Sequence, residues 1–210
     1  MYYGGNNHGS IVEIKGEWYI FYHRHTNGTN FSRQGCIEKI QILEDGRIPQ
    51  VSMTSCGANG GPLKGEGEYP AYIACSLYCR DEALTVGMPG DWMDCRFPRI
   101  TQDQPDGVEG NGYIFNMCQG AVAGFRYFDC RQVKRIAVRT RGGWGHFIVR
   151  TAWDGEPAGT IELSRSNEWK PFTGEVPIPD GVQSLYFEFD GKGKLSFASF
   201  ELLTEPSGNN

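Results

Sequence analysis

Short runs of β-branched and aromatic residues recur along the first fifty residues, separated by polar segments that contain glycine. Residues 11–14 and 18–22 lie on either side of Gly16, which is typical of a β-hairpin. Residues 35–43 alternate polar and apolar side chains and predict a third strand. The Asp45-Gly46 pair is a hairpin signal, and it predicts a returning strand over residues 47–53. Four short strands in up-and-down order form one propeller blade or half of a small sheet.

Beyond Arg99 the same kind of run returns about every ten residues, with glycine-rich turn signals between the runs. No segment shows the 3.6-residue periodicity of an amphipathic helix, so we predict an all-β chain without helices. Regular short strands of this kind are typical of a β-sandwich or barrel. The predicted strands cover residues 112–117, 121–128, 135–141, 146–153, 159–163, 169–178, 183–190 and 194–203.

The segment between these two regions has a different composition. Residues 56–70 hold five glycines and two prolines, which favours a linker or surface loop. A single apolar strand is predicted over residues 72–78, and residues 87–98 are rich in turn formers. We therefore divide the chain into a first part (1–57), a linker with a connecting strand (58–98) and a sandwich (99–205).

Composition narrows the classes of partner. The 210-residue chain has a net charge of −5 and a pI near 5.4, so it lacks the basic surface that a nucleic acid requires. No apolar run approaches the ~20 residues that span a bilayer, so no membrane partner is expected. Met1 leads directly into polar residues without a signal peptide, and we expect a cytoplasmic chain or a piece of a longer one. The seven cysteines are expected to be reduced thiols, because an odd number without a signal peptide argues against a disulfide framework.

Two sets of residues are candidates for chemistry. His8 and Arg33 both stand at the start of a predicted strand, where they could face a common axis and bind an anion or a sugar hydroxyl. A lone histidine at such a position can equally be structural. Trp144 and Trp169 lie beside turn signals, and an exposed indole there could stack on the apolar face of a sugar ring. The other aromatic residues of this region, Trp153 and Tyr186 among them, are expected to pack mostly in the core.

The motifs also carry a resemblance to two known families. The last part of the catalytic domain of glycoside hydrolase family 43, which contains β-xylosidases and α-arabinofuranosidases, is similar in order and spacing to residues 2–57. Residues 99–203 resemble a family 6 carbohydrate-binding module. The first resemblance rests on Gly5-Asn6-Asn7-His8-Gly9-Ser10, Trp18 to Arg24, Arg33-Gln34, Asp45-Gly46 and Thr54-Ser55-Cys56-Gly57, and the second on residues 135–141, 145–155, 168–170, 182–189 and 195–202.

The resemblance implies an architecture and roles. The chain would be a jelly-roll β-sandwich preceded by roughly one blade of a five-bladed β-propeller, from a glycosidase that acts on xylan- or arabinan-type hemicellulose. His8 matches the histidine that holds a cation, such as calcium, on the propeller axis, and Arg33 matches the arginine that reaches the sugar. Trp169 falls at the sugar-stacking tryptophan of the module. The stacking tyrosine would fall near Gln119 or Gly120, and the usual calcium-binding carboxylates are replaced by Gln102 and Ser196.

Catalysis by the chain alone is not expected. Glycoside hydrolysis needs two carboxyl groups that flank the bond, and the three catalytic carboxylates of the family come from earlier blades. The carboxylates of residues 1–56, including Glu38, are expected to be solvated surface charges. Three interpretations stay open: a non-catalytic fragment of a glycosidase, a working sugar-binding module, and a structural module that docks onto a missing propeller portion or associates with itself.

Overall fold

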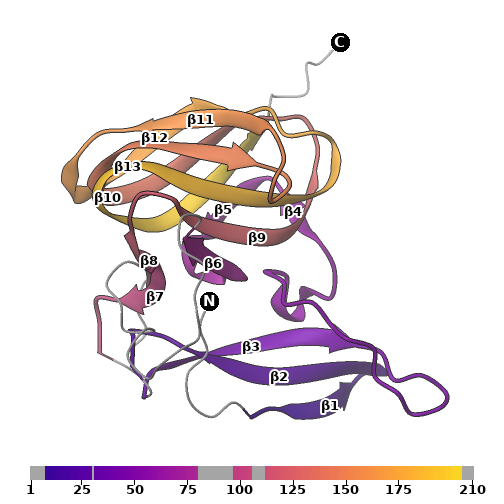
Figure 1. Cartoon of the computed structure of the whole chain (residues 1–210). Helices are drawn as coiled ribbons and strands as arrows, with labels where there is room; N and C mark the ends of the chain where they lie inside the picture. Colours follow the sequence, from indigo (N-terminus) through magenta and orange to yellow (C-terminus); the bar gives the residue numbers. More distant parts are fainter. Residues whose placement is uncertain (1–7, 30, 80–96, 106–111, 205–210) are drawn as a thin grey trace.

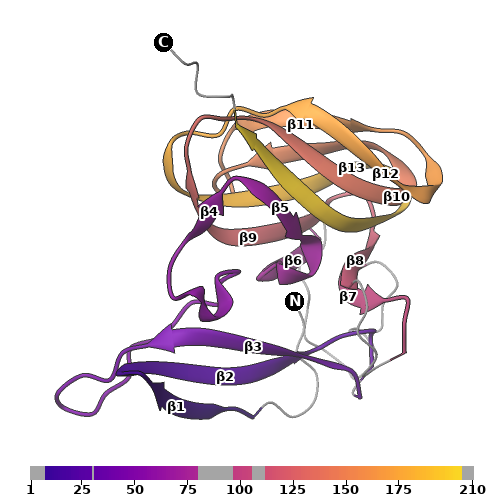
Figure 2. The same ribbon diagram turned by 180° about the vertical axis from the view of Figure 1, so that it is seen from behind.

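The computed structural model describes residues 8–29, 31–79, 97–105 and 112–204, and these form two packed parts (Figures 1 and 2). A three-stranded antiparallel sheet lies at one end of the molecule and consists of β1 (Ser10–Ile14), β2 (Glu17–His25) and β3 (Arg33–Ile40). A ten-stranded β-sandwich lies at the other end. The all-β fold predicted from the sequence is confirmed.

The hairpin predicted around Gly16 is confirmed. Lys15 and Gly16 both have positive φ, 54° and 81°, which is the geometry of the two-residue turn that suits a twisted hairpin. The turn fixes the register, which pairs Val12 with Tyr19 in β1 and β2 and then Tyr19 with Lys39 in β3.

The fourth strand predicted over residues 47–53 is wrong. A turn does form at Asp45-Gly46, where the Gly46 N–H donates to the Leu43 carbonyl at 2.8 Å. The chain beyond it forms no strand, because Pro49 has no N–H to donate to a ladder. The segment instead turns back to Glu38, to which the Thr54 N–H and hydroxyl both donate at 2.7 Å. A 3-10 turn, η1 (Gly57–Asn59), follows.

The sandwich uses two very long strands where the sequence predicted four shorter ones. β10 (Val133–Arg150) pairs through its first half with β12 (Ser166–Glu175) and through its second half with β11 (Pro157–Leu163). β13 (Gly181–Thr204) pairs along the whole of β10. The remaining strands are β4 (Leu63–Gly65), β5 (Gly67–Pro70), β6 (Ser76–Cys79), β7 (Arg99–Gln102), β8 (Gly112–Met117) and β9 (Ala121–Cys130).

Glycines explain why the predicted turns became bends within strands. Gly142 and Gly145 have φ of 98° and 139°, and the register of β10 against β13 shifts between residues 142 and 144. A Cβ at Gly145 would lie 2.3 Å from the Asp190 carbonyl oxygen, so the two backbones approach closely only because glycine is present. Bulges of this kind bend the strand and increase its local twist while its pairing with β13 continues.

The segment expected to connect the two parts contributes to the sandwich. β4 pairs with β9, β5 with β13 and β6 with β9, while a 3-10 turn, η2 (Ala71–Ile73), precedes β6 in the segment where one strand was predicted over residues 72–78. Between the two layers lies a core of interlocked phenyl rings, which includes Phe125, Phe187, Phe197 and Phe200.

None of the described residues belongs to an α-helix, and no described helix is long and apolar enough to cross a membrane. The six cysteines in the described part of the chain are free thiols, and Cys95 lies outside it.

Candidate functional site

The two parts of the molecule are joined by a buried arginine. Arg24, in β2, is 3% exposed and donates from Nη1 to the Ala74 carbonyl at 2.5 Å and from Nη2 to the Tyr72 carbonyl at 2.6 Å. Its Nε donates to Gln34 Oε1 at 2.7 Å, which fixes the guanidinium against the three-stranded sheet. A buried guanidinium requires such partners, so Arg24 ties β2 to the turn η2 of the sandwich.

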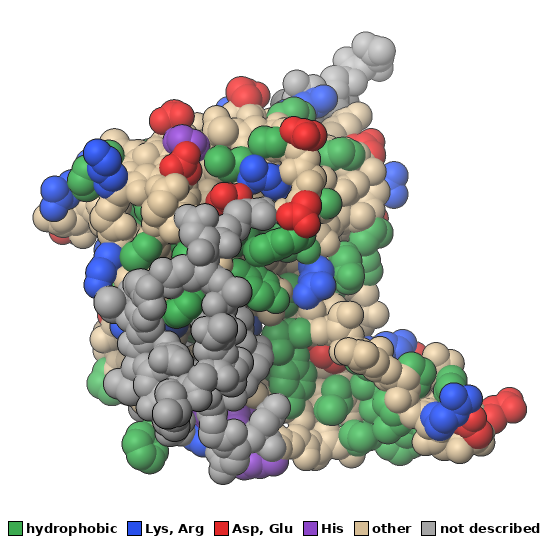
Figure 3. Space-filling view, viewed as in Figure 1, with side chains coloured by type: hydrophobic (Ala, Val, Ile, Leu, Met, Phe, Trp, Pro, Cys, Tyr) green, Lys and Arg blue, Asp and Glu red, His purple; other side chains and the backbone are tan. Residues whose placement is uncertain are grey.

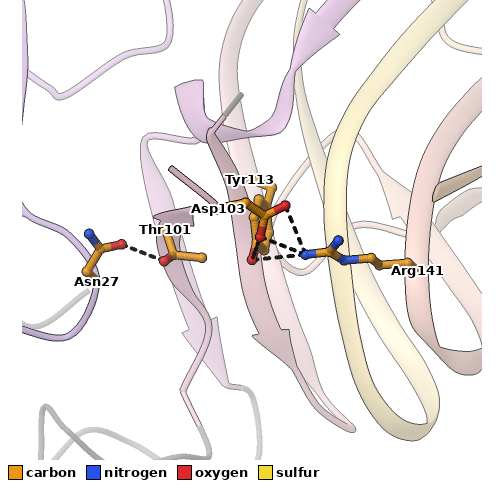
Figure 4. Close-up of polar contacts among 5 residues, drawn as sticks. All are labelled: Asn27, Thr101, Asp103, Tyr113 and Arg141. Atoms are coloured by element: carbon orange, nitrogen blue, oxygen red, sulfur yellow. Dashed lines mark hydrogen bonds and ion pairs between the residues drawn. The ribbon is translucent and has the colours of Figure 1, made fainter. Parts of the chain in front are cut away.

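A second junction joins the loop after β2 to strand β7. The Asn27 N–H donates to the Ile100 carbonyl at 2.9 Å, and the Thr101 hydroxyl donates to Asn27 Oδ1 at 2.5 Å. Figure 4 shows Thr101 pointing toward Asn27 on one side, while Asp103 meets Tyr113 and Arg141 on the other. The loop that precedes Arg33 is therefore held by the sandwich.

The predicted meeting of His8 and Arg33 at one end of the sheet is supported by the register. Because β1 and β3 both run antiparallel to β2, their starts lie at the same end, where Arg33 pairs with His25. The His8 and His23 rings are 5.1 Å apart between centroids, and the His23 and His25 rings 5.9 Å. Residues 5–7 of the same motif lie outside the described residues.

This end of the sheet does not by itself form a metal site. Within the described ranges, no group of three or more His, Cys, Asp or Glu side chains is placed to hold a metal ion. Burial, with Arg33 and His23 as nearby positive charges, lowers the pKa of His25, and neither of its ring nitrogens contacts solvent or a described hydrogen-bond partner. His8 as a ligand of an axial cation stays a prediction that requires ligands from elsewhere.

Glu38 is not the solvated surface charge expected from the sequence. It is 6% exposed, and it accepts hydrogen bonds from Thr54 and, at 3.3 Å, from the Tyr22 hydroxyl. Burial raises the pKa of Glu38, against the effect of the donors from Thr54. This burial could not be predicted from the strand pattern. Glu38 faces the segment after the Asp45-Gly46 turn, which contains Pro49 and does not form the predicted strand.

Glu38 lines a cleft of about 710 Å³ together with Glu17. Glu17 is half-exposed and forms an ion pair with Lys39 at 2.7 Å. The cleft therefore lacks the two buried, opposed acids that glycoside hydrolysis uses.

Trp169, in β12, lines a groove of the sandwich. This groove has a volume of about 960 Å³, and its walls come from β5, η2, the segment after β7, β8, β10, β12 and β13. The aromatic ring beside Trp169 is Tyr113, with centroids 5.2 Å apart and an angle of 73° between planes. The tyrosine beside Trp169 thus comes from β8, and the correspondence of the family's stacking tyrosine to Gln119 or Gly120 stays a prediction. Tyr113 belongs to strand β8, directly after Gly112, which lines the groove.

Arg141 lies over both rings. Its guanidinium carbon is 4.3 Å from the Trp169 centroid and 5.1 Å from that of Tyr113. Nη2 donates to the two carboxylate oxygens of Asp103 at 3.0 and 3.3 Å and to the Tyr113 hydroxyl at 3.1 Å. The Tyr113 hydroxyl in turn donates to Asp103 at 2.8 Å (Figure 4).

These contacts shift the ionisation of the cluster. The hydrogen bond from Tyr113 and the Arg141 guanidinium lower the pKa of Asp103. Burial, with the neighbouring Asp103 carboxylate, raises the pKa of Tyr113. The resulting state at neutral pH is an ionised Asp103, a neutral Tyr113 and a charged Arg141.

The other candidate platform, Trp144, is 40% exposed in the middle of β10. The Arg165 guanidinium carbon lies 5.5 Å from its ring centroid. Close by in the register, His146 pairs with Asp190, and their side chains are 3.4 Å apart. Trp144 is thus accessible to a ligand. In the described structure, the cation–π contact recorded for its ring is with Arg165.

Trp153 and Tyr186 are exceptions to the expectation that most aromatic residues of this region pack in the core. Both are only half-buried, and with Tyr78 they form a chain of edge-to-face contacts at 5.1 and 6.0 Å on the outer face of the sheet that contains β6, β9 and β13. Trp153 lies in a turn after β10, and alternation along the strand could not place it.

The chain is similar to known proteins in both sequence and structure. No family model matches it. A "Xylosidase/arabinosidase" of Thermoclostridium stercorarium is 59% identical over 206 residues, and the chain spans 44% of the length of that protein. The described fold matches a glycoside hydrolase family 43 arabinoxylan arabinofuranohydrolase from Bacillus subtilis over 96% of the chain and 42% of that structure, with 21% identity and a TM-score of 0.56.

The sandwich has structural relatives of its own. A family 6 carbohydrate-binding module from Clostridium stercorarium, solved with cellobiose, matches 70% of the chain and 99% of its own length, with 14% identity and a TM-score of 0.52. A β-1,3-glucan-binding family 6 module from Bacillus halodurans matches 67% of the chain and 98% of its own length, with 17% identity and the same TM-score. The chain therefore resembles glycoside hydrolase family 43 enzymes of the xylosidase/arabinosidase type, with a β-sandwich of the family 6 carbohydrate-binding fold.

Proposed function

We propose that the chain is a non-catalytic portion of a glycosidase for xylan- or arabinan-type polysaccharides, and that its sandwich binds their sugar chains. The observation that carries this proposal is the groove around Trp169 in a chain 59% identical to a xylosidase/arabinosidase. Two solved modules of the same fold bind cellobiose or β-1,3-glucan, which supports carbohydrate as the ligand class.

The chemistry of the groove suits a neutral, hydroxyl-rich ligand. An indole offers an apolar face for a sugar ring, while Glu68, Ser199, Arg139 and Gln104 offer hydrogen-bond donors and acceptors along the walls. Glu68 accepts the Ser199 hydroxyl at 2.6 Å, so part of this wall is already ordered. A few fixed polar groups around an apolar surface are typical of a ligand site.

The test is calorimetric titration of the 210-residue chain with xylotetraose and cellotetraose. We expect measurable binding that Trp169→Ala weakens at least about tenfold, as for other central tryptophan anchors. Trp144→Ala is the matched control, and a larger loss from this variant would move the site to Trp144. Binding that neither variant alters would contradict both assignments.

The sugar-contact and cation roles of Arg33 and His8 belong to the same proposal. Both lie at one end of the three-stranded sheet, and both would act together with groups from the rest of a longer enzyme. We expect no turnover of nitrophenyl xyloside or arabinofuranoside by the chain alone, since the described residues hold no opposed pair of buried acids. Robust turnover would refute this part of the proposal.

A structural role is the alternative, and a specific observation favours it for the three-stranded sheet. All five residues of β1 are exposed, including Ile11, Val12 and Ile14. Figure 3 shows hydrophobic side chains along this sheet, at the lower right of the view. An apolar edge strand of this kind pairs readily with further strands, from the rest of a longer protein or from a second copy. A strictly monomeric chain whose β1 amides are protected from exchange would count against this role.

A further inference from the structure

One face of the Trp169 indole, in the groove of the proposed site, already has an occupant from the chain itself. Arg141 places its guanidinium carbon 4.3 Å from the Trp169 centroid, which is stacking distance. A guanidinium is planar and weakly hydrated, so it covers an aromatic face much as a sugar ring does.

Three contacts hold this guanidinium in place. Asp103 accepts from Nη2 through both carboxylate oxygens, and the Tyr113 hydroxyl accepts from the same nitrogen. Tyr113 is itself 7% exposed and donates to Asp103, so its hydroxyl cannot move to follow a ligand without breaking a buried contact. The cluster is therefore closed on itself when no ligand is present.

The same contacts leave the guanidinium displaceable. The Arg141 side chain is 28% exposed and Asp103 is 54% exposed, and an ion pair of this exposure contributes little and is screened by salt. No second carboxylate contacts Arg141 in the described structure, since Asp103 forms its single ion pair.

We propose that Arg141 is an intramolecular competitor for the Trp169 face, so that a sugar binds the groove by displacing the guanidinium from the ring into solvent. This inference rests on the proposed sugar-binding function of the groove. It assigns to Arg141 the role of setting affinity, and to Asp103 and Tyr113 that of holding the competitor in place.

Arg165 provides a matched control. It lies over Trp144 at 5.5 Å, as Arg141 lies over Trp169, but it forms no ion pair in the described structure. Arg165→Ala removes the same type of side chain from Trp144, the other candidate tryptophan, and should leave binding at Trp169 unchanged.

The experiment is titration of the whole chain with xylotetraose, a neutral probe, for wild type and for Arg141→Ala, Asp103→Asn and Arg165→Ala. We expect Arg141→Ala to tighten binding by about 2- to 30-fold, the range of a cation–π contact expressed as affinity. Asp103→Asn should tighten it less, and adding it to Arg141→Ala should have no further effect, because the two act as one unit.

Salt gives a second readout that a purely structural role would not move. Raising NaCl screens the Asp103–Arg141 pair, so wild-type affinity for the neutral probe should increase with salt, while that of Arg141→Ala should stay constant.

The outcomes separate the two proposals. If wild type binds, Trp169→Ala abolishes binding and Arg141→Ala weakens it or leaves it unchanged, the groove is a sugar site but the competitor role is refuted. If no variant binds xylotetraose or cellotetraose, the proposed function of the groove fails, and the inference fails with it. Tightening in Arg141→Ala that Trp169→Ala reverses supports both.

Discussion

The three-stranded sheet and the sandwich both consist of strands in which polar and apolar residues alternate, yet they bury their side chains very differently. In the described residues before Ala71, Ile40 is the one buried hydrophobic residue, whereas the sandwich encloses a continuous core of phenyl rings and aliphatic side chains. Most of the large exposed hydrophobic residues belong to the first part: Ile11, Val12, Ile14, Phe21, Phe31, Ile48 and Val51.

This difference teaches that alternation of polar and apolar residues specifies a strand without specifying what covers it. The sandwich supplies both layers of its own core, so it satisfies the requirement that a sheet bury one face. The three-stranded sheet is instead attached by polar contacts, of which the Arg24 guanidinium is the most buried, and its apolar edge is left for another surface.

The largest expected effect comes from a matched pair of phenylalanine substitutions. Phe200 is 1% exposed and contacts Phe125 at 4.7 Å between centroids, so Phe200→Ala should cost about 3–5 kcal/mol of the free energy of unfolding. Phe21, in β2, is 38% exposed, and Phe21→Ala should change it by only about 0.5 kcal/mol.

Urea unfolding followed by tryptophan fluorescence measures both. Equal losses of stability in the two variants would contradict the difference in burial between the two parts. They would mean that Phe21 is covered in solution, for example by a second copy of the chain. Sedimentation of the same samples would then show the association.

The next effect concerns the attachment of the two parts. Arg24→Met keeps an unbranched side chain but removes both guanidinium donors. The Ala74 carbonyl then loses its donor, and the Tyr72 carbonyl keeps only Gln34 Nε2, at 3.3 Å. We expect a loss of about 2–4 kcal/mol in the stability of the attached sheet, because buried hydrogen bonds to a charged group are strong and costly to break.

Hydrogen exchange locates that loss. Amides of β2 and β3 should exchange faster in Arg24→Met, while those of β9 and β13 should keep their protection. Arg47→Ala, which breaks an exposed ion pair with Asp45, is the control and should leave both regions unchanged. Uniformly faster exchange in Arg24→Met would show instead that the two parts unfold as one unit.

Much of the fold could be predicted because the relevant signals are local. Lys15-Gly16 fixes a hairpin by its own backbone geometry, and residues 112–117 form a strand at the predicted bounds. The predictions that were wrong depended on distant partners. Arg141-Gly142-Gly143 predicts a turn in isolation, but the two glycines accommodate the close approach of β13.

The residues of the candidate site could also be predicted only in part. Trp169 could be chosen from the sequence because it lies beside loop signals, and it does line the groove. Its neighbours Tyr113 and Arg141 could not, because they come from β8 and β10 and meet Trp169 across the sheet. Glu38 was misassigned for the same reason, since its burial depends on a segment sixteen residues further along the chain.

The smallest expected effect tests how the returning segment is held against the three-stranded sheet. Burial raises the pKa of Glu38 above its usual value near 4.5, although Thr54 and Tyr22 donate to its carboxylate. The folded state therefore retains the proton over a pH range in which the unfolded chain has lost it. Below pH 4.5 both states are protonated and Glu38 costs nothing, whereas its cost to folding grows as the pH rises through the raised pKa.

Glu38→Gln removes this titration while keeping a side chain of the same shape that can bond to Thr54. We expect the stability of wild type relative to Glu38→Gln to fall between pH 4 and pH 7, as measured by urea unfolding at each pH. Glu13→Gln, on exposed strand β1, is the control and should follow wild type. If wild type instead gained on Glu38→Gln as the pH rose, the hydrogen bonds from Thr54 and Tyr22 would outweigh burial. The carboxylate would then be an attachment point of the three-stranded sheet comparable in kind to Arg24.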